Sequence, residues 1–161
     1  MPSSAPPDFP CLFPLGFHHL SMADLERVCV EFFPLSKTRR PIMDGLTEFM
    51  QRIVDAKVPG EMWANGSFLT EKIDPKDVDI IVRVNGTIYD NGTAEQRGAI
   101  DWAIANQKTT LNCDSYVLME YPATHPLHVE GKWWYSYWHK QWGFSREDDP
   151  KGIVVISLGI P

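Results

Sequence analysis

The chain has 161 residues, of which 43% are hydrophobic and 22% charged, and its formal net charge is −6. That length suits one domain with a single core, and the composition is typical of a globular protein. The negative charge argues against an extensive sequence-independent nucleic-acid surface, because such surfaces depend on clustered Lys and Arg. The three cysteines lack disulfide or zinc spacing, the N-terminal residues do not show the basic and apolar regions of a secretory leader, and no apolar run approaches membrane-spanning length. We therefore expect a cytoplasmic protein without a membrane span.

The N-terminal part is expected to contain an extended arm and two helices. Prolines recur through residues 1–20, which favours an extended segment over a helix. Ser21 is a good N-cap for a first helix, and Pro41 suits the first turn of a second helix that continues to about Val58. We therefore expect an arm over residues 1–20 and a single domain over residues 21–161.

The remainder is expected to alternate strands and helices. Asn-Gly pairs at 85–86 and 91–92 are typical of turns, and Thr93 with Gln96 predicts a capping box for a helix to about Gln107. Branched residues and alternation predict four strands, at residues 61–65, 77–84, 111–121 and 151–159. This order predicts an α/β (α+β) fold, in which a small mixed sheet of about four to five strands is flanked by helices.

A tryptophan-rich stretch, residues 131–144, is expected to form the last helix. Trp134, Trp138 and Trp142 share one helical face, which is typical of packing against a core. Trp133 lies off that face, so we expect it alone among these residues to make a surface contact, for example by stacking on a base.

Two aspartates carry the clearest chemical signal. Asp77 and Asp79 lie two residues apart in a predicted strand, so their side chains leave the same face. Such a pair can hold Mg²⁺ with substrate phosphates, although it can equally begin an ordinary edge strand. Gly66-Ser67 favours the metal interpretation, because glycine lets the backbone approach an anion and a short helix starting there directs N–H groups at phosphate.

The segment GSFLTEKIDPKDVDIIV resembles the signature of the DNA polymerase beta-like nucleotidyltransferases, in which Gly-Ser or Gly-Gly precedes Asp-x-Asp on the next strand. The chain is also similar to an uncharacterised prokaryotic family of small stand-alone proteins in that superfamily. That family has two N-terminal helices, this central motif and a C-terminal block, here Arg146 and residues 150–153. The resemblance covers roughly residues 15–158 and implies a nucleotidyltransferase-like fold.

The resemblance also implies a third carboxylate on a later strand. Asp114 is the best match, since Asn112, Asp114 and Tyr116 share one face of the predicted strand, but a plain strand-end polar residue is an equal interpretation. Glu120 is the alternative. With Asp77 and Asp79, the third acid would be catalytic and would bind two Mg²⁺ ions, or Mn²⁺.

The phosphates of a nucleoside triphosphate would then lie against Gly66 and Ser67. Three cations are candidates for the same nucleotide-binding site, although each is also compatible with a solvated surface: Lys72, Arg146 and Lys151. The first follows the Gly-Ser loop, and the other two belong to the C-terminal block.

Two functions follow as hypotheses. The first is a metal-dependent nucleotidyltransferase that moves a nucleoside monophosphate from a triphosphate to a protein or RNA hydroxyl, with a cognate toxin or antitoxin as the partner that the resemblance implies. The second is a catalytically inactive module that keeps the fold and binds a nucleotide or a partner; a purely structural role is a weaker third. The hypotheses separate on whether Asp114 converges with Asp77 and Asp79 on a cleft floored by Gly66-Ser67.

Overall fold

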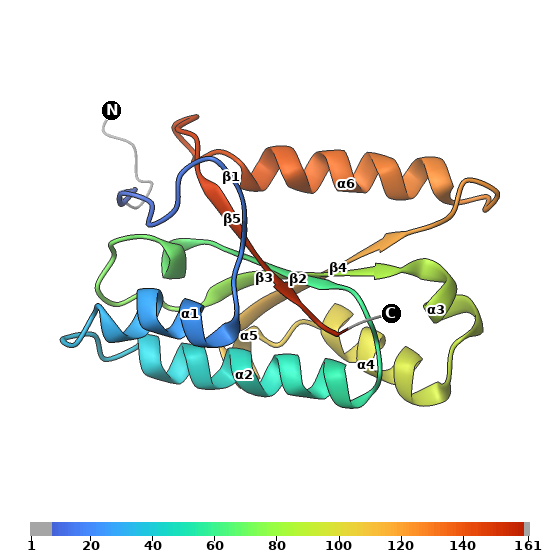
Figure 1. The fold of residues 1–161 in the computed structure, drawn as a ribbon, viewed down its shortest axis with the longest axis horizontal. Coiled ribbons are helices and arrows are strands. Elements are labelled where there is room, and N and C mark those ends of the chain that lie inside the picture. Colours follow the sequence, from blue (N-terminus) through green and yellow to red (C-terminus); the bar gives the residue numbers. More distant parts are fainter. Residues whose placement is uncertain (1–7, 160–161) are drawn as a thin grey trace.

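A computed structural model describes residues 8–159 as a sheet between two helical layers (Figure 1). The five strands, in the spatial order β1-β5-β2-β3-β4, are β1 (Gly16–His19), β2 (Glu61–Asn65), β3 (Val78–Asn85), β4 (Cys113–Glu120) and β5 (Gly152–Ser157). β1 runs parallel to β5 and β3 parallel to β4, whereas β2 is antiparallel to both of its neighbours. The predicted α/β class with a mixed sheet is confirmed.

Helices cover both faces of the sheet. Their bounds are α1 (Met22–Glu26), the π-helical turn η1 (Arg27–Glu31), α2 (Arg39–Asp55), the 3-10 turn η2 (Ser67–Leu69), α3 (Gly86–Asn91), α4 (Ala94–Ile104), α5 (Lys108–Leu111) and α6 (His128–Trp142). α6 lies along one face, and α1, α2 and α4 lie on the other (Figure 1). The described part of the chain is therefore a three-layer α/β/α arrangement.

Alternating strand positions fill the two interfaces between sheet and helices. Val78, Ile80 and Val82 belong to the core shared with α2, as the alternation of β3 predicts. Ile81 packs instead in the second core with Trp142 of α6. Asp79 lies two residues before Ile81 on the same strand, so its carboxylate also points to the face of the sheet that α6 covers.

The N-terminal arm enters the sheet. Residues 1–7 lie outside the described residues, so the arm is described only from residue 8. Within the described part of the arm, Phe17 pairs with Ile153 in the ladder between β1 and β5. The predicted boundary at residue 21 therefore falls inside the folded unit, because pairing with a strand more than a hundred residues away leaves no local pattern.

Local capping signals were mostly reliable. Ser21 caps α1 by accepting from the Asp24 N–H, and the Thr93–Gln96 capping box is present. The turn predicted at Asn85-Gly86 was wrong, because the Asn85 side chain accepts from the Thr87 N–H and starts α3. A hydrogen-bonding Asn suits an N-cap as well as a turn, so the dipeptide alone does not separate the two.

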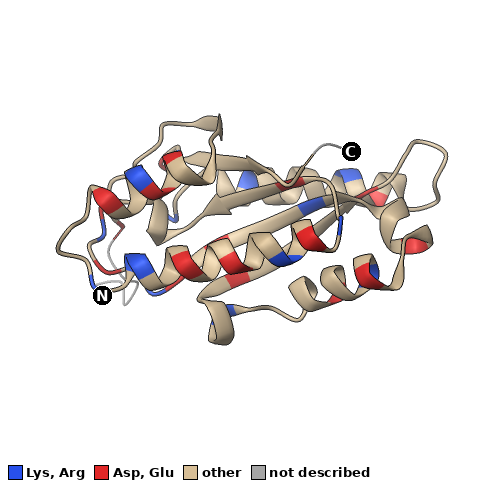
Figure 2. Ribbon diagram, turned by 60° about the horizontal axis from the view of Figure 1, so that its bottom comes forward, with Lys and Arg blue, Asp and Glu red and all other residues tan. Residues whose placement is uncertain are grey.

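The outer surface carries exposed aromatics on α6 and a mixed charge pattern. Trp133 is 58% exposed, as predicted, but Trp134 is also 40% exposed. Trp134 lies beside β4, which is an edge strand of the sheet within the described residues, so no further strand of that part of the chain covers it. Acidic and basic residues are interspersed along the helices in Figure 2, without one continuous basic face in that view. Within residues 8–159, no helix is long and apolar enough to cross a membrane.

Candidate functional site

Four strands bring the predicted site residues together at one end of the sheet, where β2 ends and β3, β4 and β5 begin. In the ladder, Asn65 lies opposite Asp79, and Asp79 lies opposite Asp114. They border a cleft of about 570 Å³, which is lined by all eight residues that the sequence assigned to the site: Gly66, Ser67, Lys72, Asp77, Asp79, Asp114, Arg146 and Lys151. The structure therefore places these eight residues around one cavity.

The Gly-Ser loop touches the central aspartate directly. Gly66 has φ +87°, and a Cβ atom at this position would lie 2.3 Å from Asp79 Oδ2. Only glycine allows this close approach. Gly66 therefore leaves room for the Asp79 carboxylate and also allows the chain to turn. The Gly66 N–H donates to Asn65 Oδ1 at 2.7 Å, and Asn65 Nδ2 donates to the Trp142 carbonyl at 2.8 Å. The predicted short helix is present as the single turn η2.

A buried arginine supports this loop from below. Arg39 is fully buried at the start of α2 and donates hydrogen bonds of 2.5 to 2.9 Å to four carbonyl groups, those of Cys29, Phe68, Thr70 and Lys72. Three of these carbonyls belong to the loop that carries the glycine, so Arg39 ties the loop to the helical layer. Sequence reasoning missed Arg39; the signal that could have identified it is a cation at a helix N-terminus, where its charge opposes the helix dipole.

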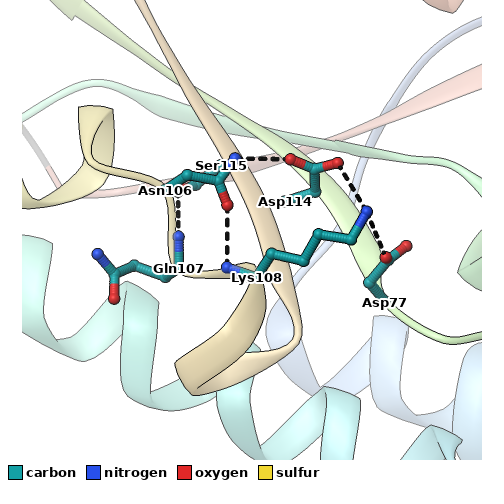
Figure 3. Close-up of polar contacts among 6 residues, drawn as sticks. All are labelled: Asp77, Asn106, Gln107, Lys108, Asp114 and Ser115. Atoms are coloured by element: carbon teal, nitrogen blue, oxygen red, sulfur yellow. Dashed lines mark hydrogen bonds and ion pairs between the residues drawn. The ribbon is translucent and has the colours of Figure 1, made fainter.

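Lys108 neutralises part of the acidic cluster. Its Nζ lies 3.0 Å from Asp77 Oδ2 and 3.3 Å from Asp114 Oδ2 (Figure 3). These two contacts raise the pKa of the Lys108 ammonium. Sequence reasoning missed Lys108, because its contact depends on the turn at Asn106, a residue with φ +64°.

Negative charge remains concentrated around Asp79. Burial first, and then the charges of Asp77 and Asp114, raise the pKa of the Asp79 carboxyl to about 6. On the opposite wall, burial lowers the pKa of the Lys151 ammonium. A carboxylate that is both buried and surrounded by like charge favours a bound proton or a bound cation.

Glu120, the alternative third acid, lies elsewhere. It pairs with Arg83, which also binds Glu61 at 2.9 Å, and it lies opposite Asn85 at the far end of β3. Asp114 is therefore the acid that joins Asp77 and Asp79 at the cleft. Strand parity did not exclude Glu120, since residues 114 and 120 point to the same face and differ only in distance along the strand.

The donor chemistry fits a hard divalent cation, although the side chains are not arranged around one. Among residues 8–159, no group of three or more His, Cys, Asp and Glu side chains is placed to hold a metal ion. The three aspartates nevertheless offer the carboxylate oxygens that Mg²⁺ and Mn²⁺ prefer. The ammonium group of Lys108 is a stand-in cation between two of them.

Aromatic side chains form another wall of the cleft. Tyr137 and Trp138 of α6 line it together with the buried Trp142. Trp133, which the sequence suggested for base stacking, is not among the residues that line the cleft. A residue off the packing face of a helix is exposed, but it need not face the site.

The fold and the cleft define a mixed α/β protein with a glycine loop facing three carboxylates. The chain belongs to the DUF6932 family, a family of unknown function, which matches residues 7–157. No curated protein and no solved structure matches the chain significantly. The function is therefore inferred from the chemistry of the cleft.

Proposed function

We propose that the chain is a metal-dependent nucleotidyltransferase, which transfers a nucleoside monophosphate from a nucleoside triphosphate to a hydroxyl group of a protein or RNA. The observation that best supports this proposal is the convergence of the Gly66-Ser67 loop with Asp79 and Asp114 in one cleft. The loop offers a close backbone approach for phosphates, and the acids offer oxygen ligands for divalent cations. Resemblance to the DNA polymerase beta-like superfamily leads to the same proposal.

The remainder of the cleft suits a nucleotide. Lys72, Arg146 and Lys151 border it and would attract the triphosphate, because cationic donors bind phosphate oxygens strongly. Tyr137 and Trp138 offer rings on which a nucleobase can stack. The volume of about 570 Å³ lies within the usual range for small-molecule sites.

The aspartates would hold one or two Mg²⁺ or Mn²⁺ ions, which when bound neutralise charge on the phosphates. Asp114 is oriented by Asn106, whose side-chain amide donates to Asp114 Oδ1 at 2.6 Å. We assign Asp114 to accept the proton of the attacking hydroxyl. The hydroxyl oxygen bonds to the α-phosphorus as the bridge to the β-phosphate breaks, and pyrophosphate leaves towards Lys72 and Lys151.

A protein acceptor is favoured over bulk RNA by the formal charge of −6. A cognate toxin or antitoxin is the acceptor or partner that the superfamily resemblance suggests. A cytoplasmic setting, which supplies nucleoside triphosphates, is part of the proposal.

Radiolabelled triphosphates test the proposal. The protein is incubated with α-labelled or γ-labelled triphosphate, Mg²⁺ or Mn²⁺, and host lysate. Label should reach a macromolecule from the α position only, and Asp79→Asn should abolish the transfer. Transfer from the γ position only would contradict nucleotidyl transfer and would indicate a kinase.

A second candidate function is an inactive module that binds a nucleotide or a partner protein. Two observations favour it: Lys108 lies between Asp77 and Asp114, and the Gly66 N–H is bonded to Asn65. This candidate predicts nucleotide binding that is unchanged by EDTA and no label transfer with any acceptor. The proposed enzyme instead predicts binding that weakens when EDTA removes the metal.

A further inference from the structure

Lys108 makes the closest cationic contact with the acidic cluster. Its ammonium group contacts Oδ2 of Asp77 and Oδ2 of Asp114 at once (Figure 3). Asp79, by contrast, makes no ion pair within residues 8–159. The two paired carboxylates are only 20% and 18% exposed, but the lysine side chain is 54% exposed. Lys108 therefore covers the acids from the solvent side.

The backbone that carries Lys108 is held firmly beside β4. Asn106 Nδ2 donates to Asp114 Oδ1 at 2.6 Å, and Asn106 Oδ1 accepts the Lys108 N–H at 2.9 Å. Between these two residues, the backbone N–H of Gln107 donates to Ser115 Oγ at 3.1 Å. These contacts fix the start of the lysine side chain next to the acids, so the pair does not depend on the chance meeting of two surface side chains.

The position of the ammonium group conflicts with that of a divalent ion. Asn106 occupies Oδ1 of Asp114, which leaves Oδ2 as the oxygen for a metal, and this oxygen is the one that Lys108 holds. Asp77 Oδ2 is engaged in the same way. Two cations that share these oxygens would repel each other across a few ångströms. Because the lysine side chain is half exposed, it can rotate outward without moving α5.

We propose that Lys108 is a tethered counter-ion that a divalent cation displaces when it binds Asp77, Asp79 and Asp114. Lys108 thereby sets the affinity of the cluster for the cation, since binding of the ion must break two ion pairs. This inference rests on the proposed metal-dependent function. Beyond that function, Lys108 lowers the affinity of the cluster for the cation and stabilises the metal-free protein.

Direct measurement of metal affinity tests the inference without any assay of activity. Mn²⁺ is titrated into the full chain without nucleotide, and the bound ion is quantified by electron paramagnetic resonance. Lys108→Met should bind Mn²⁺ at least tenfold more tightly than the unmodified chain. Lys132→Met, a matched change at an exposed lysine on α6 outside the cleft, should leave the dissociation constant unchanged.

A second readout is the melting temperature. In EDTA, Lys108→Met should melt below the unmodified chain, and millimolar Mn²⁺ should raise its melting temperature more than that of the unmodified chain. Lys108→Arg keeps the positive charge, so it should retain both the stability and the weak Mn²⁺ binding. This variant is the control that separates the effect of the charge from misfolding caused by a substitution at this position. Binding by Lys108→Met that is equal to or weaker than that of the unmodified chain would overturn the inference alone. Absence of Mn²⁺ binding in both proteins would overturn the metal site and the inference together.

Discussion

Individual contacts explain why the motif needs its particular residues. Gly66 was predicted to give phosphate access, but in the structure its first role is to leave room for Asp79 Oδ2, which would lie 2.3 Å from an added Cβ. The sequence singled out Gly66, and the structure places it in the same cleft as the aspartates. It could not predict this contact, because the loop meets β3 only after both have folded.

Gly66→Ala should therefore destabilise the protein. The clash and the positive φ should together lower the free energy of unfolding by about 2–3 kcal/mol, measured by urea denaturation. Gly98→Ala in α4 is the control, since an added Cβ meets nothing within 4 Å there. Helix propensity predicts that this control gains about 0.5–1 kcal/mol. Equal effects of the two substitutions would contradict the contact with Asp79.

The Asp79 carboxyl should make stability depend on pH. Its pKa of about 6 in the folded protein exceeds the unfolded value of 3.8, so the unfolded state releases this proton first as pH rises. The contribution of Asp79 to the free energy of unfolding therefore decreases by up to about 3 kcal/mol between about pH 4 and pH 6. It stays at this lower value above that range.

Asp79→Asn removes this dependence. In EDTA at pH 7 the variant should unfold at a higher urea concentration than the unmodified chain, and the difference should shrink as the pH approaches 4. If the free energy of unfolding of the two proteins changed in parallel across this pH range, ionised Asp79 would not destabilise the folded protein, and the prediction would be contradicted.

At the scale of elements, Arg39 connects α2, η1 and the site loop. Its four hydrogen bonds to carbonyl groups, two of them buried and two part-buried, would be lost in Arg39→Met. This loss should cost about 3 kcal/mol or more, because those carbonyls would be left without this partner. Arg40→Met is a matched control. Arg40 is half exposed and pairs with Glu26 on the surface, so its loss should cost about 0.5 kcal/mol. Chemical denaturation of both variants measures the difference, and similar losses would contradict the role given to Arg39.

The elements that the sequence predicted best are those with local signals. Periodicity and caps located α2, α4 and α6, and alternation located β2, β3, β4 and β5. β1 and the contact of Lys108 with the acids were missed, since both depend on segments that meet only in the folded chain. Asn85 was misassigned because a turn and an N-cap use the same side-chain chemistry.

At the scale of the whole molecule, thiol accessibility reports on the core and on the cleft. Cys29 and Cys113 are fully buried, whereas Cys11 is partly exposed and lines the cleft. Ellman's reagent should therefore modify one thiol quickly in the native protein and three in guanidinium. Burial raises the pKa of the Cys11 thiol, so the assay is best run near pH 8.5.

Nucleotide binding should protect this same thiol. A triphosphate with Mg²⁺ should slow the modification of Cys11 several-fold, because the ligand would fill the cleft that Cys11 lines. Cys11→Ser should show no rapid modification in either condition. An unchanged rate at saturating nucleotide would place the nucleotide elsewhere.

The most direct test of the central claim is a crystal structure with Mn²⁺ and a triphosphate whose α–β bridge resists cleavage. The account predicts anomalous scattering from Mn²⁺ within bonding distance of Asp79 and Asp114, the phosphates against Gly66-Ser67, and Lys108 turned away from Asp77. A nucleotide bound outside this cleft, or bound inside it without Mn²⁺ on the aspartates, would contradict the account.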